Sequence, residues 1–289
     1  MNTFSWLLRR ELWENRAAWI APMATAAVFV LIAAAGLFNG VTASFPQELT
    51  HELTRESVDP RQVAVVGLIG IAAVFLLVLQ LGQYSYLVDC LYAERKDRSI
   101  LFWKSLPASD TATVLSKLVF ALLVMPAIAA AGVLAAQLLI YLLVSVKFSS
   151  TAGLIATLWS PAVWGKAMGY ALYVLLLVEL WALPLMAWVL LVSAYSPRTP
   201  GLLALLVPLC AALVEKLLLG SSHVLHIVVG RMGLPHASTG PMITLDKIDW
   251  NVTTDFSVVA MPELWLGLLV AAGFVWAAIE IRRRRDPAV

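Results

Sequence analysis

The sequence predicts an all-α membrane protein with six transmembrane helices, and three observations support this prediction. Of the 289 residues, 61% are hydrophobic and only 13% are charged, whereas a soluble domain carries about 25% charged residues. Six apolar stretches are long enough to cross a bilayer, which takes about 20 residues. Tryptophan and tyrosine residues gather near the ends of these stretches, as they do at membrane interfaces. We therefore expect residues 1–289 to form a single transmembrane domain.

The orientation of the spans follows from the lysine and arginine residues in the loops. An even number of spans puts both termini on one side, and thirteen basic residues fall on that side against six on the other. Cytoplasmic loops carry the excess of basic residues, so the prediction is N-in and C-in. The predicted spans cover approximately residues 19–38, 63–88, 115–146, 168–194, 201–219 and 263–281.

The N-terminal segment, residues 1–18, has its own amphipathic pattern. Phe4, Leu8 and Leu12 recur at every fourth position, while Glu11 and other charged residues supply a polar surface. This pattern is typical of a helix that lies along the cytoplasmic membrane interface before the first span. The alternative is that these residues are only the flank that anchors that span.

The longest external connection, residues 220–262, is too apolar for a solvated loop. Its segment 223–229 is apolar but shorter than a span, which predicts a short re-entrant or interfacial helix. The alternative is that span five continues through this segment.

The cytoplasmic loop between spans two and three, residues 89–114, is the most informative part of the chain. It predicts a short amphipathic helix that Pro107 ends, followed by a new helix that Ser109 or Asp110 can cap. The helix would carry exposed aromatic side chains beside charged ones. This pattern is compatible with two roles for the helix: it could dock on another protein, or it could rest on lipid as an interfacial helix. The apolar patch consists of Ile100, Leu101, Phe102, Trp103 and Leu106.

The same loop resembles that of the ABC-2 type transporter permeases. The matching features are the Glu94-Arg95 start, an apolar helix, the turn Leu106-Pro107-Ala108-Ser109, and Lys117 at the entry to span three. The resemblance implies a coupling helix, which inserts into a groove of a separate cytoplasmic ATPase. The residues that it assigns to docking and coupling are Glu94, Arg95, Arg98, Ile100, Phe102, Trp103, Lys104, Leu106 and Pro107.

The resemblance also implies the partners and the location of the chain. Two ATPase subunits and a second permease, either identical or a paralogue, would form an exporter in the bacterial cytoplasmic (inner) membrane. ATP and Mg would bind in the ATPase, because this chain lacks a Gly-x-x-x-x-Gly-Lys-Ser/Thr phosphate loop. The chain is therefore not expected to be an enzyme by itself or to hold a cofactor. Membrane lipid is an expected partner, and nucleic acid is not, because no soluble domain gathers the basic residues.

A few polar residues within or near the spans are candidates for the translocation path. Glu179 lies in the middle of span four and Glu215 near the end of span five; ionisable residues in spans usually face a bundle interior or a cavity. The alternative for Glu179 is a protonated or hydrogen-bonded packing residue. Arg282 to Arg285 are interpreted as a stop-transfer anchor at the C-terminus.

Other function classes find less support in the sequence. His223 and His226 share a helix face but lack a further ligand, so no metal site is predicted. An intramembrane enzyme acting on lipid-linked or peptide substrates would need a nucleophile or paired acids at one depth, such as Glu179 opposite His223 or His226. The sequence offers no Ser-His, paired-Asp or His-Glu-x-x-His constellation. A secondary transporter would rest on Glu179 and Pro184 alone and would leave the cytoplasmic loop unexplained.

Overall fold

The computed structural model describes residues 3–38, 60–99, 109–147, 156, 159–232 and 256–284, which are helical apart from short turns. Ile100, Phe102, Trp103, Lys104, Leu106 and Pro107, expected to form most of the coupling helix, lie outside the described residues. The helices are α1 (Thr3–Glu14), α2 (Ala17–Phe38), α4 (Pro60–Asp89), α5 (Tyr92–Lys96), α7 (Asp110–Val119), the π-helical turn η1 (Phe120–Val124), α8 (Met125–Lys147), α10 (Pro161–Tyr195), α11 (Pro200–Leu219), α12 (His223–Met232), the 3-10 turn η5 (Phe256–Ala260) and α13 (Pro262–Arg284).

Six helical segments are long and apolar enough to cross a membrane, so the protein is a multi-pass membrane protein. They are α2, α4, the continuous α7–η1–α8, α10, α11 and α13, and they coincide with the six predicted spans. The third segment has 38 residues and is therefore about 57 Å long, well above the thickness of a bilayer core. Its charged residues Asp110 and Lys117 lie in its N-terminal part, α7.

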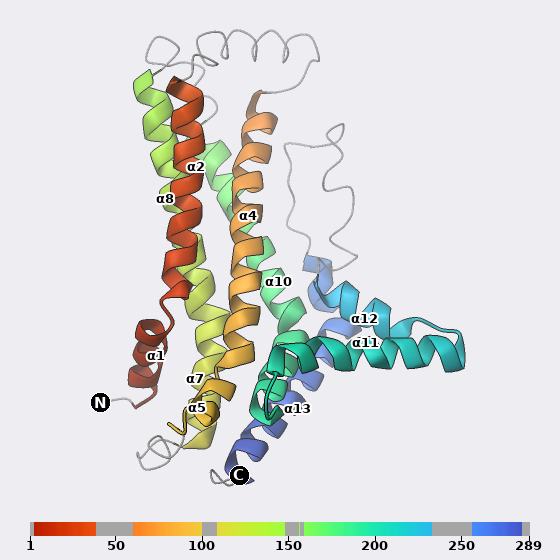
Figure 1. The fold of residues 1–289 in the computed structure, drawn as a ribbon. Helices are drawn as coiled ribbons and strands as arrows, with labels where there is room; N and C mark the ends of the chain where they lie inside the picture. The colour runs from red at the N-terminus through yellow and green to blue at the C-terminus, as the bar shows by residue number, and fades with distance from the viewer. Residues whose placement is uncertain are drawn as a thin grey trace.

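The start of α1 and the end of α13, which are the two ends of the described chain, lie at the same end of the bundle (Figure 1). There α1 forms a separate helix at the foot of α2, next to α7, and the last turn of α13 also lies beside α7. An N-in and C-in arrangement requires this placement of the termini. Which end faces the cytoplasm remains a prediction from the basic residues.

Helix α11 differs in direction from the other long helices. It runs sideways out of the bundle, and α12 returns beside it (Figure 1). The hydroxyl of Tyr84 donates to Gly201 O at 3.2 Å, and Trp188 Nε1 donates to Ala204 O at 3.1 Å, so the first turns of α11 are hydrogen-bonded to α4 and α10. A helix lies where the sequence predicts span five, and its crossing of the membrane remains a prediction.

Local sequence signals account for where these helices begin and end. Ser109 is the N-cap of α7, its hydroxyl accepting from Ala112 N at 3.1 Å, so Ser109 and not Asp110 is the cap. Ser160 caps α10 in the same way, with Pro161 at the first helical position. Gly220, at φ 67°, ends α11 in the left-handed conformation that glycine adopts without steric cost.

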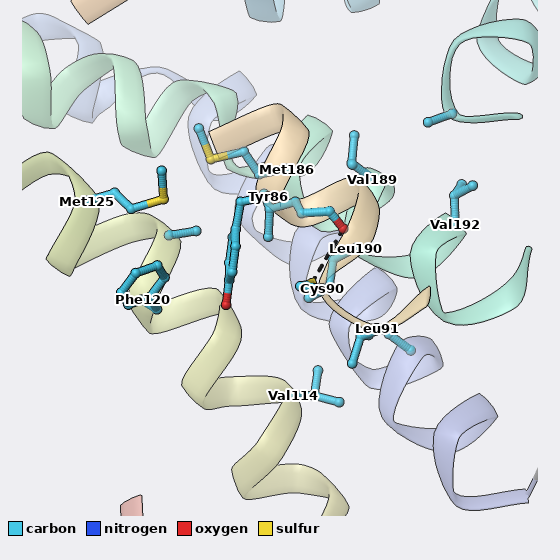
Figure 2. Close-up of a cluster of buried hydrophobic side chains, with 14 of the residues drawn as sticks. Tyr86, Cys90, Leu91, Val114, Phe120, Met125, Met186, Val189, Leu190 and Val192 are labelled. Carbon is cyan, nitrogen blue, oxygen red and sulfur yellow. Dashed lines mark hydrogen bonds between the residues drawn. The ribbon is translucent and has the colours of Figure 1, made fainter. Parts of the chain in front are cut away.

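The largest buried cluster joins α4, α7, η1, α10 and α13 near the end of the bundle where the termini lie. Figure 2 shows its centre, where Tyr86 of α4 stands beside Phe120 of η1 and Met125. The rings of Tyr86 and Phe120 are 5.1 Å apart and inclined at 56°, a favourable tilted arrangement. This apolar core supports the polar groups described below.

Gly132 marks the closest approach between α2, α4 and α8. A Cβ atom at this position would lie 2.8 Å from Phe75 Cε1 and 3.2 Å from Pro22 Cβ. We expect Gly132→Ala to lower the free energy of unfolding by about 1–3 kcal/mol, because the packed ring of Phe75 must move. Thermal unfolding in detergent measures this change. Gly165→Ala is the control, since nothing lies within 4 Å of that Cβ, and an equal loss in both variants would contradict the prediction.

Candidate functional site

A cluster of charged side chains lies buried where α1, α5, α7 and α13 meet, at the base of the 89–114 loop. Glu94 of α5 is 5% exposed, Lys117 of α7 is 2% exposed and Arg282 of α13 is 6% exposed. Buried charges are costly unless they are paired, so their mutual contacts define the cluster. We call it the charged junction; its members are Arg10, Glu11, Glu94, Asp110, Lys117 and Arg282.

Glu94 is the centre of the charged junction. One of its oxygens lies 3.1 Å from Lys117 Nζ and 3.4 Å from Arg10 Nη2, and the other accepts from Arg282 Nη1 at 2.7 Å. A single carboxylate of the loop thus holds cations from α1, α7 and α13. Burial lowers the pKa of the Arg10 guanidinium, but the carboxylates of Glu14 and then Glu94 hold it above its ordinary value.

The remaining members complete the pairing. Lys117 Nζ also lies 2.8 Å from Glu11 Oε1, and Arg282 Nε lies 3.1 Å from Asp110 Oδ1. The hydroxyl of Tyr86, on α4, donates to Glu11 Oε2 at 2.7 Å. Three carboxylates therefore face three cations, and four helices besides α5 take part.

Arg95 fastens the same loop to α10. Its Nη2 donates to Ser193 O at 2.5 Å and to Ser196 O at 2.8 Å, carbonyl groups at the C-terminal end of α10. The hydroxyl of Ser193 in turn accepts from the backbone N–H groups of Leu91 and Tyr92 at 3.2 Å each. The beginning of the loop is thereby bound to α10 as well as to α1, α7 and α13.

The residues assigned to docking by resemblance separate into two groups where the structure describes them. Glu94 and Arg95 are turned inward, as their partners above show. Arg98 is exposed, and its φ of 56° ends α5 in the left-handed conformation. Ser99 Oγ donates to Glu94 O at 3.3 Å and closes this turn.

Two expectations for charged residues are wrong. Glu11 was expected on the polar surface of the N-terminal helix, and it is 4% exposed because Lys117 and Tyr86 hold it inside. Arg282 was expected in a stop-transfer anchor, and it is buried against Glu94 and Asp110. Arg283 and Arg284 are exposed, as an anchor requires.

The π-helical turn η1 follows the charged junction within the third segment. The N–H of Met125 donates to Phe120 O, five residues earlier. In this register the next donor would be residue 126, which is a proline and has no N–H. The carbonyl of Ala121 is thereby open to an outside donor, and Gln83 Nε2 of α4 donates to it at 2.8 Å.

Glu179 meets the same glutamine in the interior of the bundle. It is 6% exposed, and Gln83 is fully buried. Gln83 Nε2 lies 2.9 Å from Glu179 Oε1 and 3.0 Å from Oε2, and Gln80 Nε2 lies 3.4 Å from Oε1. We call Glu179, Gln83 and the carbonyl of Ala121 the acid–amide site. It joins α4 and α10 to the π-helical turn.

An apolar cavity of about 170 Å³ lies between α4, α8 and α10. Phe75, Leu79, Val133 and Leu175 are among its lining residues, and Tyr170 is the lining residue whose side chain carries a polar group. Leu79 and Leu175 precede Gln83 and Glu179 by four residues each, so the acid–amide site lies about one helical turn away. Glu179 itself does not line this cavity. Its assignment to the translocation path remains a prediction.

Glu215 lies elsewhere, at the turn between α11 and α12. Its Oε1 accepts from Ser221 Oγ at 2.6 Å and from His223 N at 2.8 Å, and its Oε2 accepts from Val224 N at 2.7 Å. The carboxylate thus satisfies the free N–H groups at the start of α12, a short helix where one was predicted. No hydrogen bond joins Glu215 to Glu179 in the described chain.

The sequence indicated several of the polar residues of these sites, but it did not indicate which residues pair with each other. Gln80 and Gln83 interrupt an apolar run, and Lys117 opens one, which are signals that a buried polar partner is needed. Nothing in the sequence pairs Glu94 with Arg282, because 188 residues separate them. Among the residues searched, no group of three or more His, Cys, Asp or Glu could hold a metal ion. No protein-family profile, curated protein or solved structure matches this chain.

Proposed function

We propose that the chain is the membrane-spanning permease subunit of an ABC-type exporter, driven by a separate cytoplasmic ATPase. Two ATPase subunits and a second permease would complete the transporter in the bacterial inner membrane. The charged junction is the observation that supports this proposal best. It ties the base of the loop expected to dock on the ATPase to the ends of several spans.

The arrangement suits the transmission of force from the loop to the bundle. Glu94 and Lys117 lie on the two sides of residues 100–108, and they are ion-paired with each other at 3.1 Å. A displacement of the loop therefore acts on α7 directly, and through Arg282 and Arg95 on α13 and α10. A loop that only rested on lipid would not need buried charges at its base, since such charges are costly to bury.

The exposed groups of the loop are the ones available to a partner. Lys96, Asp97 and Arg98 are exposed, and they lead into the aromatic residues Phe102 and Trp103 of the sequence. Aromatic and arginine side chains dominate the binding energy of protein interfaces. Arg95, by contrast, supports the loop from inside, so its substitution would disturb the fold as well as any docking.

The test is copurification of the full-length tagged chain from native membranes. We expect a protein with a phosphate loop among the bound partners, identified by mass spectrometry. The variant Arg98→Glu, Phe102→Asp should reduce the bound ATPase about tenfold, which corresponds to about 1.4 kcal/mol. The single variant Arg98→Glu should keep the unfolding temperature of the wild type, because Arg98 is exposed.

The matched control is Arg283→Glu, which reverses an exposed charge at the same end of the molecule but outside the loop. It should keep the ATPase bound. The proposal fails if no nucleotide-binding partner is recovered, or if the loop variant retains as much ATPase as the control.

A further inference from the structure

The acid–amide site contains more acceptors than donors when Glu179 is charged. Gln83 Nε2 has two hydrogens, and three oxygens lie within 3.0 Å of it: both carboxylate oxygens of Glu179 and the carbonyl of Ala121. Gln83 Oε1, on the same amide, is buried and accepts from no donor of the described residues. Gln80 Nε2 supplies one further hydrogen bond, to Glu179 Oε1 at 3.4 Å. A charged Glu179 therefore leaves one buried acceptor unpaired, which is Gln83 Oε1.

The other buried glutamine of the bundle shows the usual outcome. Gln137 Oε1 accepts from Trp164 Nε1 at 3.0 Å, and its Nε2 donates to Leu68 O at 3.2 Å. Both ends of that amide are satisfied, as buried polar groups generally are. The unpaired oxygen of Gln83 therefore calls for an explanation specific to its site.

Turning the amide of Gln83 around does not solve the problem. The amide oxygen would then face Ala121 O, which can only accept. Proline at position 126 removes the backbone donor that could otherwise serve this carbonyl. The orientation of Gln83 is thus determined by Ala121, and the missing hydrogen must come from Glu179.

No cation compensates the Glu179 carboxylate within the described chain. Its hydrogen bonds are those to Gln80 and Gln83, and no Lys, Arg or His forms an ion pair with it. Arg231 of α12 contacts α10 at the ring of Trp181. Glu179 lies two residues before Trp181, which places it about 200° away around the axis of α10. Gln80 and Gln83, which do not titrate, are the α4 side chains that face Glu179.

The other titratable groups on the helices packed against α10 have separate partners or lie near helix ends. Tyr84 and Tyr86 of α4 donate to Gly201 O and to Glu11, respectively. The charged residues of these helices are Arg61 and Asp89 on α4, Glu94, Arg95 and Lys96 on α5, Glu215 and Lys216 on α11, Arg231 on α12, and Glu263, Glu280, Arg282, Arg283 and Arg284 on α13.

We propose that Glu179 and Gln83 form a proton-binding site inside the membrane part of the bundle. In the bound state the Glu179 carboxyl holds the proton and donates it to Gln83 Oε1. Gln83 Nε2 then donates one hydrogen to the carboxyl oxygen of Glu179 and the other to Ala121 O. This ring requires a rotation of the carboxyl from Nε2 toward Oε1, and the two atoms are bonded to the same carbon. Every polar group of the site is then paired.

A proton fits this site better than a metal ion does. The amide N–H group of Gln83 points at both carboxylate oxygens, so a donor occupies the place where a cation would bind. Release of the proton to water leaves a charge in an apolar interior, which is costly. The site also connects to the rest of the protein, since Ala121 follows Lys117 of the charged junction by about one helical turn.

The experiment is infrared difference spectroscopy on the full-length protein in nanodiscs, with pH as the only variable. We expect a carbonyl band of a protonated carboxylic acid that disappears as the pH rises. The band should be absent from Glu179→Gln, which resembles the protonated form and should fold like the wild type. In Gln83→Leu the band should remain but shift, because the hydrogen bond to the amide is lost.

The controls separate a proton site from its alternatives. Gln137→Leu removes a buried glutamine elsewhere and should leave the band unchanged. Addition of Na⁺ or K⁺ at constant pH should also leave it unchanged. A band that persists in Glu179→Gln, a band unshifted in Gln83→Leu, or no band at any pH at which the protein is folded overturns the proposal. Loss of the band on adding Na⁺ or K⁺ overturns it in favour of a cation site.

Discussion

Glu94→Ala is expected to lower the free energy of unfolding by about 3–5 kcal/mol, the cost of breaking a buried ion pair by removing one partner. The substitution leaves Lys117, Arg282 and Arg10 without the carboxylate that all three share. Lys117 is 2% exposed, so water does not replace the lost charge. Chemical or thermal unfolding of the detergent-solubilised protein measures the loss.

Glu280→Ala is the matched control for this substitution. Glu280 is a carboxylate on α13 that pairs with Arg283 and Arg284, both exposed, so its removal should cost at most about 1 kcal/mol. The double variant Glu94→Met, Lys117→Met should be less destabilised than the sum of the single variants, with a coupling of at least about 1 kcal/mol. Equal losses for Glu94→Ala and Glu280→Ala would show that the junction is not the buried network described above.

Phe120→Ala is expected to cost about 3–5 kcal/mol, because it empties the space of a fully buried ring. Phe120 opens the π-helical turn and packs against Tyr86, whose hydroxyl holds Glu11 in the charged junction. The variant should therefore weaken the junction as well as the core. The loss is measured by the same unfolding experiment.

Leu123→Ala in the same turn provides the comparison. Leu123 is 63% exposed, so a smaller side chain there leaves no enclosed cavity, and we expect a loss of less than about 1 kcal/mol. If both substitutions cost the same, the turn does not pack against α4 as the structure has it.

The charged junction and the acid–amide site lie along one segment of the chain. Asp110 and Lys117 belong to α7, and Ala121 belongs to the π-helical turn that continues it. A movement of α7 at the base of the loop would therefore act on the contact between Ala121 and Gln83. In the proposed transporter, this segment connects the ATPase-docking loop to the interior of the bundle.

The sequence by itself determined the class of fold and the positions of the helices. Long apolar runs in lipid must satisfy their own backbone hydrogen bonds, and only helices do this within a single segment. The helical stretch of span five and the short helix after it followed from the same apolar pattern. The sideways course of α11 did not, because hydropathy gives the length of a helix and not its direction.

Only the tertiary structure decided which polar residues work together. Glu11, Glu94, Lys117 and Arg282 are charged residues that sequence reasoning assigned to surfaces, loops and anchors, and folding brings them into one buried network. The partner of Glu179 is likewise a glutamine 96 positions away. Pairing across such separations depends on how helices pack, whereas apolar runs and caps are local. The sequence therefore predicts the spans and the candidate loop, and packing decides how that loop is joined to the bundle.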